Sequence, residues 1–179
     1  MRLFRRIALL FALALATPLA AQDYAKMSTA QLEAAAPRLH PAAIYHLAAK
    51  KLSEGKGEEA ARWMYAGQLR YRFLLSARSP EAVKAIKPGN DEAILFSALT
   101  EQVGRPINEY IGGNVDDWIA VIDWALDWDA RNANPITSKT QHAATLASIR
   151  KGLVDFRDSL DGRRDEIRAG RAKNGLPNR

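Results

Sequence analysis

The sequence predicts an all-α protein: a compact helical domain of about six helices behind an N-terminal signal peptide. Beyond the first 21 residues, Ala, Leu, Glu, Lys and Arg dominate while Val and Ile are sparse, a composition that favours helices. No four-residue run alternates β-branched side chains, as a half-buried strand would. Apolar side chains instead recur three and four residues apart, which is the spacing of one helical face.

Residues 1–21 have the three parts of a secretory signal peptide. Three arginines precede an uninterrupted apolar run over 7–16, and the small residues Ala20 and Ala21 follow. A helix of this length rises about 15 Å, half of the roughly 30 Å hydrocarbon core of a bilayer. We therefore expect an export signal cleaved after Ala21 by the general secretory route, and no membrane anchor.

The chain that follows is expected to form one domain over 22–170 and a basic, frayed tail over 171–179. A domain near 150 residues buries roughly 68 to 70% of its unfolded surface, so a core alone can hold it. The sequence contains no cysteine, which excludes disulfides, thiolate metal sites and a lipoprotein anchor. The leader indicates the periplasm as the destination, with full secretion as the alternative.

The net charge of the chain excludes nucleic acid as a partner. The sequence holds 26 basic and 20 acidic side chains, and three of the basic ones lie in the leader. After the leader, basic side chains exceed acidic ones by about three, and the segment 161–179 alone accounts for this excess. A charge excess this small, on an exported protein, does not favour nucleic-acid binding.

Helix signals divide the first part of the domain. Ser28, with Gln31 three residues later, forms a capping-box start for a short helix that ends before Pro37. Pro41 then begins a helix that continues to about Ser53, where the letters EGKG break it.

A third helix is expected from Glu58 to about Ala77, with apolar side chains on two faces. At 100° per residue, one sector collects Trp63, Met64, Gly67, Tyr71, Leu74 and Leu75, and the opposite side collects Tyr65, Ala66, Leu69 and Phe73. The flanks between these faces hold Arg62, Arg70 and Arg72. Such a helix lies between neighbours, so we expect Trp63 and Tyr71 to pack in the core. Tyr65 fits either a partly exposed contact or a ring against a later helix.

The next stretch, 79–90, reads as a short helix or turn closed by Pro88 and Gly89. Asn90 is expected to cap a helix that continues through Val103, and the Gly-Arg-Pro letters at 104–106 are expected to stop it.

Two helices complete the domain. Asn114 is expected to cap a Trp-rich helix over 115–130, with two aspartates in its first turn where the helix dipole favours them. A long final helix is expected from 137 or 138, with bends at Gly152 and Gly162. Its apolar stripe, typical of a coiled-coil packing seam, consists of Leu146, Ile149, Leu153, Phe156, Leu160 and Ile167.

Residues 41–77 resemble a tetratricopeptide-type helical pair, in which apolar and small residues recur at fixed offsets. The matching positions are Ile44, Leu47, Ala48, Ala60 and Met64. Lys51 and Arg72 depart from the pattern, because an aromatic residue and a proline are usual there. A second copy is not visible, so the resemblance implies one hairpin and no array.

The chain is also similar to a family of uncharacterised exported bacterial proteins. The letters that carry this resemblance are YAGQLRYR, GRPINEY and the C-terminal EIRAGRAKNGLPNR, and the likeness extends over most of the chain after the leader. It implies export and brings no activity with it.

Catalytic and metal-binding motifs are missing from the sequence. There is no Gly-x-Ser-x-Gly, no Gly-rich phosphate loop and no His-Glu-x-x-His. Ser-x-x-Lys occurs at 53–56 and 148–151, without the downstream partners that penicillin-recognising enzymes need. His40 and His46 are off the spacing of a zinc pair, and 123–132 lacks the ligands of a calcium loop. We therefore predict no catalytic residue, no metal and no cofactor.

The segment 105–110, between helix breakers, is the most promising functional segment. Arg105, Asn108, Glu109 and Tyr110 combine a cation, an amide, an acid and an amphipathic ring in what reads as a connector, and such connectors often carry recognition. In the structural alternative, Arg105 pairs with Glu109 and Tyr110 packs back to close a corner between helices.

Two functions from different classes fit these observations. The first is a non-enzymatic exported protein, such as an immunity or inhibitor protein or an envelope adaptor, that binds another protein or peptide. Its partner-binding residues are predicted to be Tyr65, Arg72, Arg105, Asn108, Glu109 and Tyr110. The alternative is a cell-envelope-modifying enzyme with Glu109 or another carboxylate as general acid. A role in assembly through the final helix is a third possibility.

Overall fold

The structure, a computed structural model, describes residues 24–85 and 91–179. These residues are helical with turns and contain no strand, which confirms the predicted fold class. The predicted signal peptide, 1–21, lies outside the described residues, as does Asn90. The α-helices are, in order, α1 (Thr29–Ala35), α2 (Pro41–Ser53), α3 (Gly57–Ser76), α4 (Pro80–Lys84), α5 (Glu92–Leu99), α6 (Arg105–Ile111), α7 (Val115–Arg131), α8 (Ala143–Asp161) and α9 (Arg164–Lys173).

The helices of the first half begin where their capping residues predict. Ser28 and Gln31 form both hydrogen bonds of the capping box at α1. Pro41 is the first residue of α2, and the preceding His40 caps the helix by accepting the Ala42 N–H on its Nδ1 at 3.3 Å. In both helices the local sequence is sufficient to set the start.

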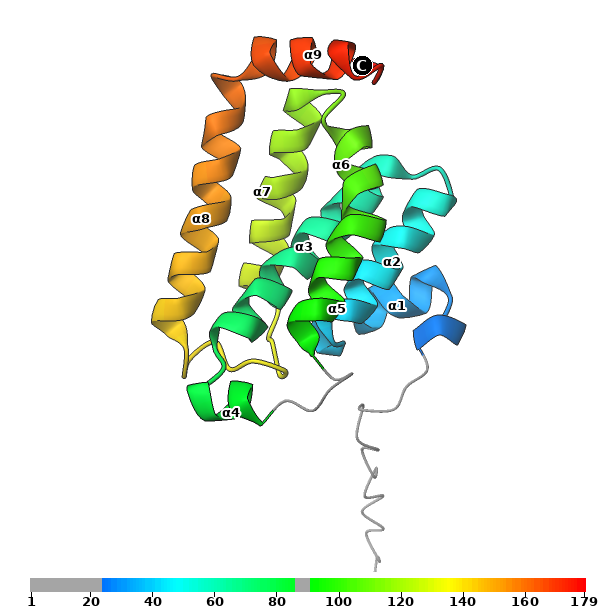
Figure 1. The fold of residues 1–179 in the computed structure, drawn as a ribbon. Helices are drawn as coiled ribbons and strands as arrows, with labels where there is room; N and C mark the ends of the chain where they lie inside the picture. The colour runs from blue at the N-terminus through cyan, green and yellow to red at the C-terminus, as the bar shows by residue number, and fades with distance from the viewer. Residues whose placement is uncertain (1–23, 86–90) are drawn as a thin grey trace, which may run out of the picture.

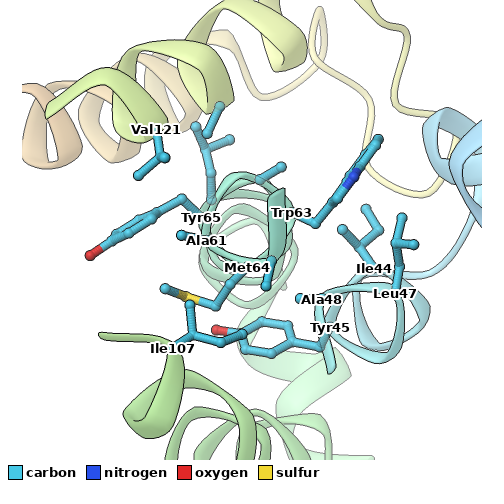
Figure 2. Packing of buried hydrophobic residues seen from close by; sticks show 14 of the residues in the cluster. Ile44, Tyr45, Leu47, Ala48, Ala61, Trp63, Met64, Tyr65, Ile107 and Val121 are labelled. Carbon is cyan, nitrogen blue, oxygen red and sulfur yellow. The ribbon is translucent and has the colours of Figure 1, made fainter. Parts of the chain in front are cut away.

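The central helix is α3, which crosses the molecule between α2 on one side and α7 on the other (Figure 1). Viewed along its axis, Trp63 and Tyr65 leave α3 on opposite sides, and apolar side chains of α2, α6 and α7 surround it (Figure 2). Trp63 packs edge-on against Trp124 and Trp128, and Tyr71 is fully buried and stacks on Phe96. The prediction of a helix with two buried faces is therefore confirmed.

The expected helix stop at 104–106 is wrong. After α5 the chain passes through a π-helical turn, η4 (Thr100–Gly104), directly into α6, and the Arg105 N–H bonds to the Thr100 carbonyl. Pro106 lies in the first turn of α6, where a missing N–H costs little. Ile107 and Ile111 of α6 are fully buried, so packing stabilises the helix that the local letters argue against.

The second half follows the prediction at α7 and departs from it afterwards. Asn114 caps α7 by accepting the N–H groups of Asp116 and Asp117. The final helix begins only at Ala143, and a turn at Gly162 divides it into α8 and α9, so that α9 lies across the ends of α7 and α8 (Figure 1). With this division and the helical α6, the described residues contain more helices than the expected six or so.

The apolar stripe of the final helix packs against the core, but loosely. Its members in α8 are half-buried except for Leu160, which is fully buried. Between Arg150 and Leu160, α8 therefore lies beside α3 and α7 without closing fully onto them.

The tail expected to fray lies against the corner between α6 and α7. The Arg171 side chain is buried and donates to the Pro177 carbonyl at 2.6 Å. The Arg179 guanidinium lies 4.0 Å from the centre of the Tyr110 ring and donates to its hydroxyl at 3.0 Å. The Arg179 N–H also donates to the Gly113 carbonyl at 2.6 Å.

A buried ion cluster joins α3, α7 and α8. Arg70 and Asp129 are each about 1% exposed, and Arg70 Nε lies 3.2 Å from Asp129 Oδ1. The other carboxylate oxygen contacts Lys139 Nζ at 3.1 Å and Arg150 Nη1 at 3.2 Å. Arg70 also donates to the Pro37 carbonyl at 2.8 Å. The sequence analysis placed Arg70 only on a flank of its helix, so this cluster is a finding of the structure.

Candidate functional site

A cleft of about 280 Å³ opens between α8 and the core, where α3, α6 and α7 meet it. Its walls are mainly apolar and are formed by Leu69, Trp118, Ile149, Leu153 and Phe156. The polar lining residues come from α3 and α6 and form what we call the polar side of the cleft: Tyr65, Gln68, Arg72 and Asn108. An apolar concavity with a few converging polar groups is the usual form of a binding site.

A chain of hydrogen bonds fixes the polar side of the cleft. Trp118 Nε1 donates to the Tyr65 hydroxyl at 2.5 Å, and that hydroxyl donates to Asn108 Oδ1 at 3.0 Å. Burial raises the pKa of Tyr65, so the hydroxyl stays protonated. Tyr65 is about 3% exposed, and its ring therefore lies against the later helices while its hydroxyl reaches the cleft.

Arg72 supplies the charge of the cleft. Among the described residues that line it, no other is charged. Arg72 is exposed and has no ion pair with any carboxylate in the described parts of the chain. A guanidinium at the edge of an apolar concavity is suited to a carboxylate or phosphate ligand.

Gly152 of α8 contributes space to the cleft. A Cβ added there would meet no atom within 4 Å, although Gly152 is one of the lining residues. Gly152 is therefore a lining position with room for a larger side chain.

The structure brings together three of the six predicted partner-binding residues, Tyr65, Arg72 and Asn108. Arg105 instead pairs with Glu101 on the surface at 2.8 Å, so the expected pairing with Glu109 is not the one observed. Glu109 is exposed and does not line the cleft.

Tyr110 packs back on the start of α3, as the structural alternative expected. Its ring lies so close to the Gly57 backbone that a Cβ there would be 2.2 Å from Tyr110 Cε1. Its hydroxyl accepts a hydrogen bond from Arg179. The two contacts close the corner between α3 and α6.

The sequence analysis did not identify the other lining residues as site residues. Trp118 was expected only as part of a Trp-rich helix, and Ile149, Leu153 and Phe156 as part of a packing seam. The periodicity of the sequence predicts which faces of α7 and α8 are apolar. It does not predict whether such faces pack tightly or leave a cleft between them.

A second polar cluster links α5 to the hairpin of α2 and α3. The Tyr71 hydroxyl donates to Glu92, and His40 Nε2 lies 3.4 Å from Glu92 Oε1. Burial lowers the pKa of His40, and burial together with Glu92 raises the pKa of Tyr71. His40 also caps α2, so the cluster has a structural role in this part of the molecule.

Residues 24–85 and 91–179 contain no group of three His, Cys, Asp or Glu side chains placed to hold a metal ion. In the same residues no helix has both the length and the apolar character needed to cross a membrane. Comparison of the chain with protein-family models, curated proteins and solved structures found no match. The cleft is therefore the feature of the described residues that bears on function.

Proposed function

We propose that this is a non-enzymatic helical protein, exported to the periplasm, that binds a peptide or an exposed segment of another protein in the cleft beside α8. The observation that carries the proposal is the combination of apolar walls with Arg72 and the Tyr65–Asn108 hydrogen bond in one concavity. Immunity or inhibitor proteins and envelope adaptors are forms that such a function takes.

The tetratricopeptide resemblance supports the same class of function. The five residues that carry it, in α2 and α3, are all fully buried: Ile44, Leu47, Ala48, Ala60 and Met64. Gly67 allows close approach, since a Cβ there would lie 3.1 Å from the Tyr45 ring. Tight hairpins of this kind present grooves to peptides, although a likeness of fold indicates only the class.

The enzymatic alternative has lost its strongest candidate. A general acid needs a buried carboxyl group with a partner carboxylate or tyrosine in reach. Glu109 is exposed and does not line the cleft. We therefore favour binding over catalysis.

Peptide selection against matched glycine variants tests this function. We expect a displayed random-peptide library to yield binders of the purified protein. The Gly152→Leu variant should lose these binders, because its side chain fills the cleft. Replacing a mid-helix glycine also raises helix propensity by about 1 kcal/mol, so the variant should fold at least as well as the native chain.

Gly170→Leu is the control for this experiment. Gly170 also lies within a helix, α9, and a Cβ added there meets nothing within 4 Å, but it is not a lining residue. It should keep every binder. Binders that tolerate Gly152→Leu, or a library that yields none, would contradict the proposal.

Export is tested separately by the mature N-terminus. Mass spectrometry of the protein recovered from a periplasmic fraction should show a chain that begins at Gln22. A chain that retains Met1 and stays in the cytoplasm would contradict the export proposal and leave the cleft experiment unaffected.

A further inference from the structure

We infer that the segment bound in the cleft inserts one aromatic side chain between the apolar walls and places the carboxylate of an adjacent Asp or Glu against Arg72. This inference rests on the proposed peptide-binding function and names the chemistry of the ligand. It depends on the size of the cleft, the rings in its walls and the donors at its polar side.

The size of the cleft limits what can enter. At about 280 Å³ it lies just below the roughly 300 to 1,000 Å³ typical of small-molecule pockets. It accommodates one large side chain and is too small for a helix or a lipid tail bound along its length. Interfaces commonly concentrate their affinity in one such anchor residue.

The walls favour an aromatic anchor. Trp118 and Phe156 already meet edge to face, with ring centres 5.6 Å apart and an angle of 72° between the planes. A third ring entering beside them can extend this edge-to-face arrangement. An aromatic side chain also buries a large area while few of its torsions become fixed.

The polar side of the cleft presents donors. Because Asn108 Oδ1 accepts from Tyr65, the Asn108 amide N–H groups are the free part of that side chain, and the described residues offer them no acceptor. Arg72 adds a guanidinium with no carboxylate partner in the described chain. Donors without acceptors favour a ligand that accepts, and a carboxylate can accept two parallel hydrogen bonds from Arg72.

Other anionic partners fit less well. Nucleic acid and anionic membrane surfaces are bound by several cations in a row. This cleft offers one cation among its lining residues. A single carboxylate beside a single ring matches what is present.

The test uses the peptides recovered by selection on the purified protein, which should contain Trp, Tyr or Phe beside Asp or Glu. Each peptide is compared by calorimetry with two analogues, one with the acid replaced by its amide and one with the ring replaced by Ala. We expect the acid-to-amide change to weaken binding about tenfold, the effect of one charge-assisted contact. The change of the ring to Ala should abolish binding.

Two protein variants assign the acid effect to Arg72. Arg72→Gln should bind the acid and amide peptides equally, at the weaker affinity. Arg131→Gln removes one exposed arginine that pairs with Asp127 and does not line the cleft, so it should keep the tenfold preference.

The two proposals fail in different ways. If Gly152→Leu abolishes binding but the acid-to-amide change has no effect, or if the selected peptides lack acids or rings, the inference is overturned and the peptide-binding function stands. If the preference for acid persists in Arg72→Gln, the carboxylate binds elsewhere and the inference is also overturned. Binding that Gly152→Leu leaves intact overturns both.

Discussion

At the scale of single residues, the most consequential contact is one that joins distant parts of the sequence. Arg70 and Asp129 are 59 residues apart and share a buried ion pair, with Lys139 and Arg150 completing the cluster. Neither residue stands out in the sequence. Arg70 lies on the flank of an apolar helix, and Asp129 lies in the segment 123–132, which lacks the ligands of a calcium loop. Which residue pairs with a buried charge depends on how the helices pack, and the spacing of residues along the sequence does not reveal it.

We predict that Asp129→Asn lowers the free energy of unfolding by about 3 to 5 kcal/mol, the usual cost of removing one member of a buried pair. The substitution keeps the shape of the side chain but leaves Arg70 charged and buried. Urea unfolding measures the effect. Asp127→Asn, whose carboxylate is exposed and 3.9 Å from Arg131, should change stability by less than about 0.5 kcal/mol. Equal effects of the two substitutions would contradict a structural role for the cluster.

His40 predicts a specific pH dependence. Burial, with a contribution from Arg78, lowers the pKa of His40 from its ordinary 6.5, while Glu92 opposes the shift. The folded state therefore binds this proton less readily than the unfolded state, and stability should fall as the pH drops through about 6.5. Protonation at Nδ1 would also remove the acceptor of the Ala42 N–H.

His40→Asn tests this dependence, since asparagine also caps helices well. Between pH 7 and 5.5 the variant should lose less stability than the native chain. Part of the dependence should remain, because burial also lowers the pKa of His46. An unchanged slope would show that His40 does not titrate with folding.

At the scale of elements, local signals predicted the starts of α1, α2 and α7, whereas the expected stop at 104–106 was wrong. Ser28, Pro41 and Asn114 mark helix starts because each satisfies or spares a free N–H group within its own turn. Pro106 did not stop its helix, because η4 shifts the hydrogen bonds by one residue and the buried Ile107 holds α6 in place. The stop depended on distant packing, which the local sequence does not contain.

The candidate site was predictable only in part for the same reason. Tyr65, Arg72 and Asn108 were identified by their chemistry, and the structure brings them to one cleft. Arg105 and Glu109 were chosen by the same criterion, but both are exposed and neither lines the cleft. The sequence predicts a connector at 105–110, whereas the structure has the helix α6 there, whose buried side chains Ile107 and Ile111 the connector reading did not single out.

Gly57 gives a prediction about how α3 and α6 fit together. Alanine at the start of a helix normally stabilises relative to glycine, by up to about 1 kcal/mol. Here its Cβ would overlap the Tyr110 ring, so Gly57→Ala should destabilise by about 1 to 3 kcal/mol. Thermal unfolding measures the change. Gly170→Ala, with open space around the new Cβ, should stabilise the protein.

A double variant identifies the cause of the loss. If the clash with Tyr110 is responsible, Gly57→Ala should cost nothing further in a Tyr110→Ala background. An additive loss in the double variant would place the cause elsewhere, for example in the backbone of the turn before α3.

At the scale of the whole molecule, the cleft follows from how α8 is held. At its middle, Arg150 donates to the Leu126 carbonyl and to Asp129, and near its end Leu160 is fully buried. Arg157 adds an ion pair with Asp123 of α7. The part of α8 that lines the cleft, from Ile149 to Phe156, is therefore held in place by contacts of Arg150, Arg157 and Leu160.

The shared core predicts that the molecule unfolds as one unit. The buried cluster draws residues from α1, α2, α3, α6, α7 and α8, so no group of helices has a core of its own.

Trp63, Trp124 and Trp128 meet between α3 and α7, with ring centres of Trp63 and its two neighbours 5.1 and 5.4 Å apart. Their emission therefore reports that interface, whereas far-UV circular dichroism reports all the helices. We expect the two signals to give the same urea midpoint, in the native chain and in Trp118→Phe, which removes the indole of the cleft. A fluorescence transition that precedes the loss of helix would mean that α7 separates from α3 while the helices persist, and the core would then not be cooperative.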